Sequence, residues 1–294
     1  MNLKNSLLVF LVAVLLGCNS EKVTENYLIE IDEFVTLSKL KSTKVIDFRK
    51  LKDFQEGHVN NALNIWRTDI EDASFPYGGM KANKKQLENL FSNLGIEKDD
   101  TLLLYDDKGL CDAARLWWVL QYYSFKNVKL LNGGLTTIKN ASISLTKENK
   151  KYAPSEFRFK GTNTQFFASK KQIQHAINNN SMLIDTRTKE EFLGEYIKKG
   201  AFKAGKIPKS KLIDWANAIN YDGDKKIKSK AELNEIYAGL NKNDTLYVYC
   251  HSGVRSAHTT FVLTQILGYK NILNYDGSWT EWSYYEKLLL NKDN

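Results

Sequence analysis

Cysteine is scarce in this chain, and its scarcity excludes two classes of site. The 294 residues contain only three cysteines: Cys18, Cys111 and Cys250. Three are too few for a disulfide framework in a chain of this length, and none lies in a C-x-x-C or similar metal-ligand spacing. The sequence therefore predicts neither a disulfide scaffold nor a metal site.

The chain also lacks a nucleic-acid recognition motif. Its formal net charge is +8, from 42 Lys+Arg against 34 Asp+Glu, but the basic residues are scattered in short runs at most. Without a basic stripe or motif, this balance predicts a solvated surface and no nucleic-acid partner. A mild positive field still favours small anionic substrates. With 43% hydrophobic residues over 294 positions, we expect two folded domains.

No long transmembrane run is present, but the N-terminus carries a shorter one. An apolar run from Leu7 to Leu16 follows one lysine and ends in Gly17-Cys18. It is short for a membrane span and is typical of a secretory signal. The end "LLGC" resembles a bacterial lipobox, which predicts a signal peptide over 1–17 and a lipid on Cys18. An ordinary signal with an incidental cysteine is the alternative. The mature chain would be exported and anchored to a bacterial membrane by its lipid alone, through a polar tether over 18–26.

An internal repeat organises the rest of the chain. Residues 102–134 align without a gap with 246–278 at an offset of 144, and 45–54 align with 183–192 at an offset of 138. The motif "GHV" at 57–59 then matches "GKI" at 205–207, so the second copy carries a ten-residue insertion. The chain is therefore two copies of one domain, over 27–140 and 166–294, joined by a linker over 141–165.

Each copy alternates short apolar runs with helical stretches. One apolar run ends at Asp47 or Asp185, and a second ends at Asp106 or Cys250 and continues through a glycine loop into a long helix. Strands that alternate with helices predict an α/β fold with a mainly parallel sheet flanked by helices in each copy. Sites in such sheets form at the carboxyl ends of strands, where Cys250 lies.

The stretch "CHSGVRSAH" has the residues of a reactive cysteine loop. A helix N-terminus, backbone amides and cations lower the pKa of a thiol, and Gly253 permits a tight loop. Arg255 and Arg187 add positive charge near strand ends. A buried structural cysteine is the alternative. Tyrosine phosphatases place arginine six positions after the cysteine, whereas here Arg255 is five positions on. The shorter loop suits a single sulfur atom better than phosphate.

These motifs together resemble the tandem-domain rhodaneses, which are thiosulfate sulfurtransferases. The resemblance is carried by "IDTRTKEEF", "AGKIPKSKLI", "YCHSGVRSAHTTFVLTQILGY" and "NYDGSWTEW", with first-copy counterparts "IDFRKLKDFQEGHVNNALNI" and "YDDKGLCDAARLWWVL". They cover most of 40–140 and 180–285. The resemblance implies an active second domain, an inactive first domain, no metal or organic cofactor, and a sulfur atom carried as a persulfide on Cys250 between an anionic donor and cyanide or a thiol.

The resemblance also assigns roles to single residues. The counterpart of Cys250 in the first copy is Asp106, which cannot carry sulfur, and Cys111 aligns with Arg255 instead. The motif arginine Arg187 is expected to face the substrate, and His58 is expected to brace a turn. The expected substrate-binding set is Arg187, His251, Ser252, Gly253, Val254 and Arg255. We expect a monomer.

Several alternatives stay open at this stage. The loop shares Ser-Gly-Val with 3-mercaptopyruvate sulfurtransferases but ends in Arg-Ser, so 3-mercaptopyruvate is a rival donor. A membrane-anchored sulfur carrier or binding module without turnover is a second rival. A Cys111–Cys250 disulfide is possible in an oxidising compartment, although the repeat argues against it because Cys111 is not the counterpart of Cys250.

Overall fold

The computed structural model describes residues 26–290 of the chain. The predicted signal peptide and Cys18 lie outside these residues. Within them, no helix has the length and apolar character needed to cross a membrane.

The first domain is built on a parallel five-stranded sheet. Its strand order is β1-β6-β5-β2-β4, and every pairing within it is parallel. The central strands are apolar on both sides and are almost fully buried, as expected for a sheet covered on both faces. The strands are β1 (Leu28–Ile29), β2 (Thr43–Asp47), β4 (Leu63–Asn64), β5 (Thr101–Tyr105) and β6 (Val128–Leu131).

The second domain repeats this sheet. Its order, β8-β12-β11-β9-β10, matches the first sheet strand for strand, and all of its pairings are parallel. The strands are β8 (Phe167–Ala168), β9 (Met182–Asp185), β10 (Ser210–Leu212), β11 (Leu246–Tyr249) and β12 (Ile272–Tyr275). The predicted fold class, two parallel α/β domains from an internal repeat, is confirmed.

Helices flank both sheets, and several begin at clear sequence signals. Asn83, Ser169, Thr188 and Ser229 each cap a helix with a Gln or Glu three residues later, in reciprocal capping boxes. In the first domain the helices are α1 (Ile31–Leu37), α2 (Leu51–Glu56), the 3₁₀ helix η1 (Arg67–Ile70), α3 (Lys84–Asn93), α4 (Cys111–Tyr122) and α5 (Gly134–Asn140). In the second they are α6 (Lys170–Asn178), α7 (Lys189–Leu193), the 3₁₀ helix η2 (Trp215–Ala218), α8 (Lys230–Ile236), α9 (Val254–Phe261), a π-helical turn η3 (Val262–Ile266) and α10 (Ser278–Leu290).

The segment between the domains packs along the first domain. Strand β7 (Leu145–Thr146), inside the expected linker, pairs antiparallel with β3 (His58–Val59). Further on, Phe157 and Phe159 are buried against Phe91 of α3. His58 stacks on Phe54 and its ring nitrogens lie 2.9 and 3.2 Å from two backbone carbonyls. This is the bracing role expected of that histidine.

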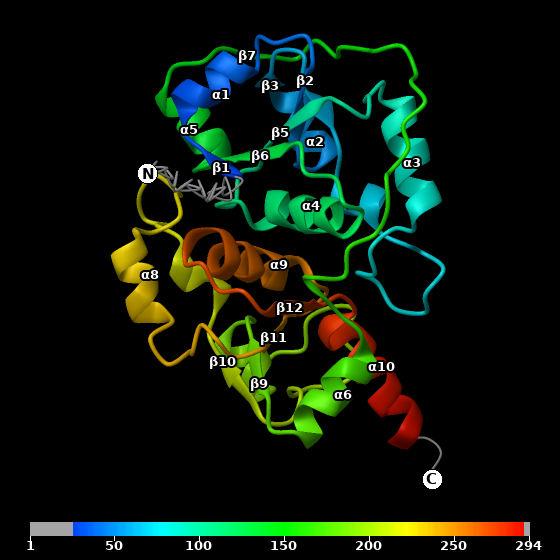
Figure 1. Cartoon of the computed structure of the whole chain (residues 1–294), viewed down its shortest axis with the longest axis vertical. Helices are drawn as coiled ribbons and strands as arrows, with labels where there is room; N and C mark the ends of the chain where they lie inside the picture. The colour runs from blue at the N-terminus through cyan, green and yellow to red at the C-terminus, as the bar shows by residue number, and fades with distance from the viewer. Residues whose placement is uncertain (1–25, 291–294) are drawn as a thin grey trace, which may run out of the picture.

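The two domains meet through the matching helices α4 and α9, which lie side by side between the sheets (Figure 1). Trp117 of α4 contacts Phe261 of α9 edge to face, with ring centroids 4.9 Å apart, and residues of both domains form one continuous apolar cluster. Each of these helices follows directly on one of the two loops at the strand ends, those after Asp106 and Cys250. The domain interface therefore lies next to both loops.

Candidate active site

Cys250 lies at the carboxyl end of β11, and hydrogen bonds between its loop and the start of α10 hold the loop in place. The side chain is buried, with 1% of its surface exposed. Ser278 Oγ accepts hydrogen bonds from the N–H groups of Cys250 (3.1 Å) and Gly253 (3.0 Å). The N–H groups of Trp279 and Thr280, at the start of α10, donate to the carbonyls of Cys250 and His251. The N–H groups of Ser252 and Ser256 face the sulfur.

The surroundings of Cys250 favour its thiolate. Burial raises the pKa of the thiol, but the Arg255 charge, the Ser256 hydroxyl and the backbone N–H groups of Ser252 and Ser256 outweigh it and lower the pKa below its ordinary value. The thiolate is the nucleophilic form of cysteine. Gly253 has φ +74°, and a Cβ there would lie 2.6 Å from the Asp276 carbonyl oxygen. The expected need for glycine at this turn is confirmed.

The first domain shows what this loop binds when no cysteine is present. The Asp106 carboxylate accepts four backbone hydrogen bonds of 2.8 to 3.0 Å, from Lys108, Leu110, Asp112 and Ala113. Two of these donors, 108 and 112, are the counterparts of Ser252 and Ser256 at the offset of 144. Burial raises the pKa of Asp106 to about 6 although the amides oppose it, so the carboxylate is ionised at neutral pH. Both loops are therefore anion-binding nests of amides.

Arg255 is beside Cys250 but shares its charge with a buried carboxylate. Its guanidinium donates two parallel hydrogen bonds to Glu191 of α7, at 2.6 and 2.9 Å. This charge-assisted pair overcomes burial and lowers the pKa of Glu191 to about 2. The first domain has Asp53 and Cys111 at the matching positions. The pair therefore belongs to the active loop alone, and the capping box Thr188–Glu191 is the sequence signal that could have drawn attention to Glu191.

Arg187 is buried in a pairing within its own domain. Its guanidinium is 2% exposed, donates to both Asp185 oxygens and to the Gly205 carbonyl, and lies 4.8 Å from the Trp279 ring. Arg49 makes the same bonds to Asp47 and Gly57 in the first domain, which has Asp106 in place of Cys250. The arrangement is kept in the copy whose loop has no catalytic cysteine, so this pairing of Arg187 is part of the shared fold.

The other predicted loop residues divide into two groups. Ser252 is half-buried beside Gly79 of the first domain, and Val254 is buried at the start of α9. His251 donates from Nε2 to the Lys199 carbonyl at 3.0 Å. Burial and nearby cations lower the pKa of His251 to about 4, so its ring is uncharged at neutral pH. The histidine thus connects the cysteine loop to the insertion and adds no positive charge.

Lys198 is a candidate site residue that the sequence reasoning missed. It lies on the ten-residue insertion and is half-buried. Burial and Arg255 lower the pKa of its ammonium, while Glu191 and Cys250 raise it, which places the ammonium within electrostatic range of both. It forms no ion pair with any residue in 26–290, unlike Arg255 and Arg187. Arg67, from the first domain, is also in electrostatic range of Cys250 but is paired with Asp112.

Cys111 is a poor candidate for chemistry. It is buried at the first position of α4, and both it and Cys250 are free thiols. Burial and Asp112 raise the pKa of the Cys111 thiol well above its ordinary value. This fits the expectation that Cys111 packs at a helix start.

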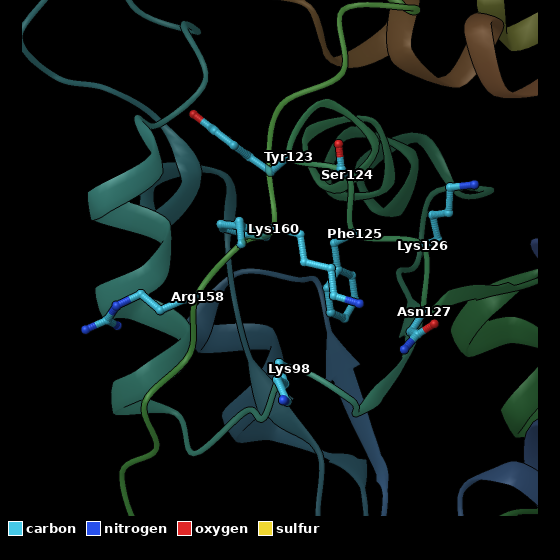
Figure 2. Close-up of a pocket in the computed structure, with 9 residues that line it drawn as sticks. Lys98, Tyr123, Ser124, Phe125, Lys126, Asn127, Arg158 and Lys160 are labelled. Carbon is cyan, nitrogen blue, oxygen red and sulfur yellow. The ribbon is translucent and has the colours of Figure 1, made fainter.

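A separate basic hollow of about 280 Å³ lies at the other edge of the first sheet (Figure 2). Lys98 precedes β5 and Asn127 precedes β6, so the hollow is at the amino ends of these strands, whereas Asp106 and Cys250 follow carboxyl ends. Its cations are Lys98, Lys126, Arg158 and Lys160. The hollow is therefore not part of the cysteine site.

Comparison with known proteins identifies the scaffold. The family model of the rhodanese-like domain matches residues 30–141 and 169–284. The chain belongs to the rhodanese family. It is 35% identical over 242 residues to the sulfur carrier protein TtuD of Thermus thermophilus, covering 78% of this chain and 83% of that protein. It is 34% identical over 240 residues to a Mycobacterium bovis protein named "Putative thiosulfate sulfurtransferase SseA", covering 78% of each.

A solved structure supports the rhodanese fold. The 3-mercaptopyruvate sulfotransferase SseA of Escherichia coli superposes with a TM-score of 0.76 at 22% identity, covering 86% of this chain and 99% of that one. At this identity the likeness shows the fold alone.

The Arg255–Glu191 pair predicts a pH dependence of rhodanese stability. Because the folded pKa of Glu191, about 2, is below its ordinary value of 4.5, the pair stabilises the fold above about pH 4.5 and this stabilisation is lost as pH falls toward 2. Glu191→Gln should lower the urea midpoint at pH 7 and lose less stability than wild type between pH 5 and pH 3. The exposed neighbour Glu195, changed to Gln, is the control. Parallel pH profiles for wild type and Glu191→Gln would contradict the pairing.

Proposed function

We propose that this rhodanese transfers the outer sulfur of thiosulfate to a thiophilic acceptor through a persulfide on Cys250. The observation that carries the proposal is the amide nest that favours the Cys250 thiolate and whose counterpart binds the Asp106 carboxylate. The two curated relatives, one named for thiosulfate and one for sulfur carriage, support sulfur chemistry and thiosulfate as donor.

The first step forms one sulfur–sulfur bond and breaks another. The Cys250 thiolate attacks the outer sulfur of thiosulfate, and sulfite leaves with the electron pair of the broken bond. The negative charge then rests on the terminal sulfur of the persulfide, where the N–H groups of Ser252 and Ser256 stabilise it. Cyanide or a thiolate attacks this sulfur, forms thiocyanate or a new persulfide, and restores the Cys250 thiolate. Such a covalent relay has ping-pong kinetics.

The charges around the nest favour an anionic donor. Arg255 lowers the pKa of Cys250, but its charge is shared with Glu191. The unpaired ammonium of Lys198 is therefore the group we assign to the sulfonate of thiosulfate and to the departing sulfite.

We predict that only one of the two described cysteines carries sulfur. After treatment with thiosulfate, wild type and Cys111→Ser should gain about 32 Da, the mass of one sulfur, and both should turn over cyanide. Cys250→Ser should show neither result, because the nucleophile is gone. Turnover by Cys250→Ser would refute the mechanism.

The Lys198 assignment predicts a change in KM. Lys198→Met should raise the thiosulfate KM about tenfold, the loss of a charge-assisted contact of roughly 1.4 kcal/mol, with a smaller change in kcat. Lys199→Met is the matched control, since the Lys199 side chain is exposed and only its carbonyl contacts His251. Equal KM values for Lys198→Met and wild type would remove Lys198 from the donor site.

A sulfur carrier without turnover is the second candidate, because the relative TtuD carries that name. A carrier would take up one sulfur per chain from thiosulfate and release it only to a specific protein. An enzyme would turn over repeatedly with cyanide. Measuring kcat/KM with thiosulfate and with 3-mercaptopyruvate, on the same preparation, separates the two donors and detects a carrier as a single turnover.

We further propose that the chain is exported and anchored by a lipid on Cys18. The support is the apolar run that ends in "LLGC". Full-length wild type expressed in a bacterium should partition into a detergent phase, and Cys18→Ala should remain in the aqueous phase. Identical partitioning of the two would reject the anchor.

A further inference from the structure

Each domain extends one arm toward the other domain's strand-end loop, which follows Cys250 in the second domain and Asp106 in the first. We define the first arm as residues 71–81 and the second arm as 219–227; each is closed by an antiparallel bridge between its ends. The Lys81 N–H of the first arm donates to Asp276 Oδ2 at 3.1 Å, and the Ile227 N–H of the second arm donates to Asn132 Oδ1 at 3.0 Å. Positions 132 and 276 are counterparts at the offset of 144. The interface is therefore nearly symmetric.

Arg115 breaks this symmetry on the side of Cys250. It lies on α4 of the first domain and is 1% exposed. Its Nη2 donates to Asp276 Oδ1 at 2.6 Å and to the Gly79 carbonyl of the first arm at 2.8 Å. Its Nη1 lies 3.4 Å from the Gly253 carbonyl of the cysteine loop and donates to it.

The inactive loop has no equivalent of this contact. The counterparts of Arg115 and Asp276 are Thr259 and Asn132, which carry no charge, and Thr259 Oγ1 donates within its own helix. The inactive loop instead faces Ile219, and Lys225 Nζ donates to the Asp107 carbonyl at 3.4 Å. Within residues 26–290, the buried ion pair across the domains lies beside the loop that holds the cysteine, whereas the pair Lys226–Glu30 on the other side is largely exposed.

The Arg115 contact acts on the Gly253–Val254 peptide of the cysteine loop. In a planar trans peptide the carbonyl of Gly253 and the N–H of Val254 point in opposite directions. That carbonyl accepts from three donors: the Ala257 N–H in the first turn of α9 (3.3 Å), Asn274 Nδ2 (3.3 Å) and Arg115 Nη1 (3.4 Å), and Arg115 is the one that the first domain supplies. The counterpart of the Val254 N–H is the Leu110 N–H, which donates to Asp106 Oδ1 at 2.9 Å. Holding the carbonyl outward therefore directs one amide of the nest inward.

The first arm adds a steric limit to the same loop. A Cβ at Gly79 would lie 2.4 Å from Ser252 Cβ, so the arm's backbone rests directly on the cysteine loop. Arg115 holds the arm and the loop together, because it donates to the carbonyls of both Gly79 and Gly253.

We propose that Arg115 is a positioning residue for the sulfur-transfer reaction, through which the first domain orients the Gly253–Val254 peptide toward Cys250. The first domain then contributes to the reaction although it carries no sulfur. This inference rests on the proposed function for its kinetic readout, while the reactivity of the Cys250 thiol tests it independently.

The charged groups near both residues limit how the test is read. Asp276, Glu71 and Lys81 are within electrostatic range of Arg115. Arg255, Lys198 and Arg67 face Cys250. Removing the Arg115 charge alone would alter the field at Cys250, so a neutral double variant is needed beside the single one.

The experiment compares Arg115→Met and the double variant Arg115→Met/Asp276→Asn with Lys225→Met in a Cys111→Ser background. Lys225→Met removes the matching contact to the inactive loop. Each protein is alkylated with iodoacetamide from pH 5 to pH 10, and kcat and KM for thiosulfate are measured. Both Arg115 variants should shift the alkylation midpoint upward by about one pH unit and lower kcat about 10- to 100-fold, because a misplaced catalytic group costs that much. KM should change less than threefold. Lys225→Met should match the parent.

Three outcomes would overturn the proposal. The first is an unchanged alkylation midpoint and kcat in both Arg115 variants. The second is an equal effect of Lys225→Met, which would indicate a general loosening of the interface. If Arg115→Met does not fold, Arg115→Lys replaces it, because one ammonium reaches fewer of the three acceptors than the guanidinium does. The third contradicting outcome is a wild-type kcat in Arg115→Lys. A parent that fails to accept sulfur from thiosulfate would refute the proposed function, while the alkylation midpoints would still test Arg115.

Discussion

The nest of backbone amides at the end of a central strand requires an anion, and this requirement shapes both domains. In the first domain the anion is the Asp106 carboxylate, held by four N–H groups. In the second the loop surrounds Cys250 and lowers the pKa of its thiol, which favours the thiolate. Unpaired buried N–H groups are costly, so an apolar residue at either position would leave the loop unsatisfied. Both copies of the domain therefore have the amide nest, and only the second has a cysteine at the strand end.

Some cations around the Cys250 loop are bound in ion pairs, and one is not. Arg187 is committed to Asp185, as Arg49 is to Asp47 in the inactive copy. Arg255 is shared between Glu191 and the thiolate. Lys198, on the insertion that only the second copy has, forms no ion pair with any residue in 26–290 and lies within electrostatic range of Cys250. It is the cation that we propose for the anionic donor.

The sequence predicted the repeat, the parallel sheets and Cys250 because these depend on local patterns. Apolar runs that end in Asp or Cys, and an alignment that places Asp106 opposite Cys250, need no tertiary contacts to be recognised. The pairing of Arg187 with Asp185 was not predicted, because a motif arginine beside a strand end can pair within its own domain or face a ligand, and the sequence pattern is the same in both cases. Glu191, Lys198 and Arg115 were missed because each acts on the cysteine loop across at least 52 residues of sequence, the separation of Lys198 from Cys250. Charge proximity at that separation is set by the fold.

The ionisation of Cys250 tests the central claim most directly. In the double variant Cys18→Ala/Cys111→Ser, Cys250 is the one cysteine left, so the thiolate absorbance near 240 nm reports its ionisation. The account predicts a titration midpoint clearly below about 8.5, the value of an unperturbed cysteine, because the amides and Arg255 stabilise the anion. A midpoint at or above that value would contradict the claim that the loop is an anion nest built around this sulfur.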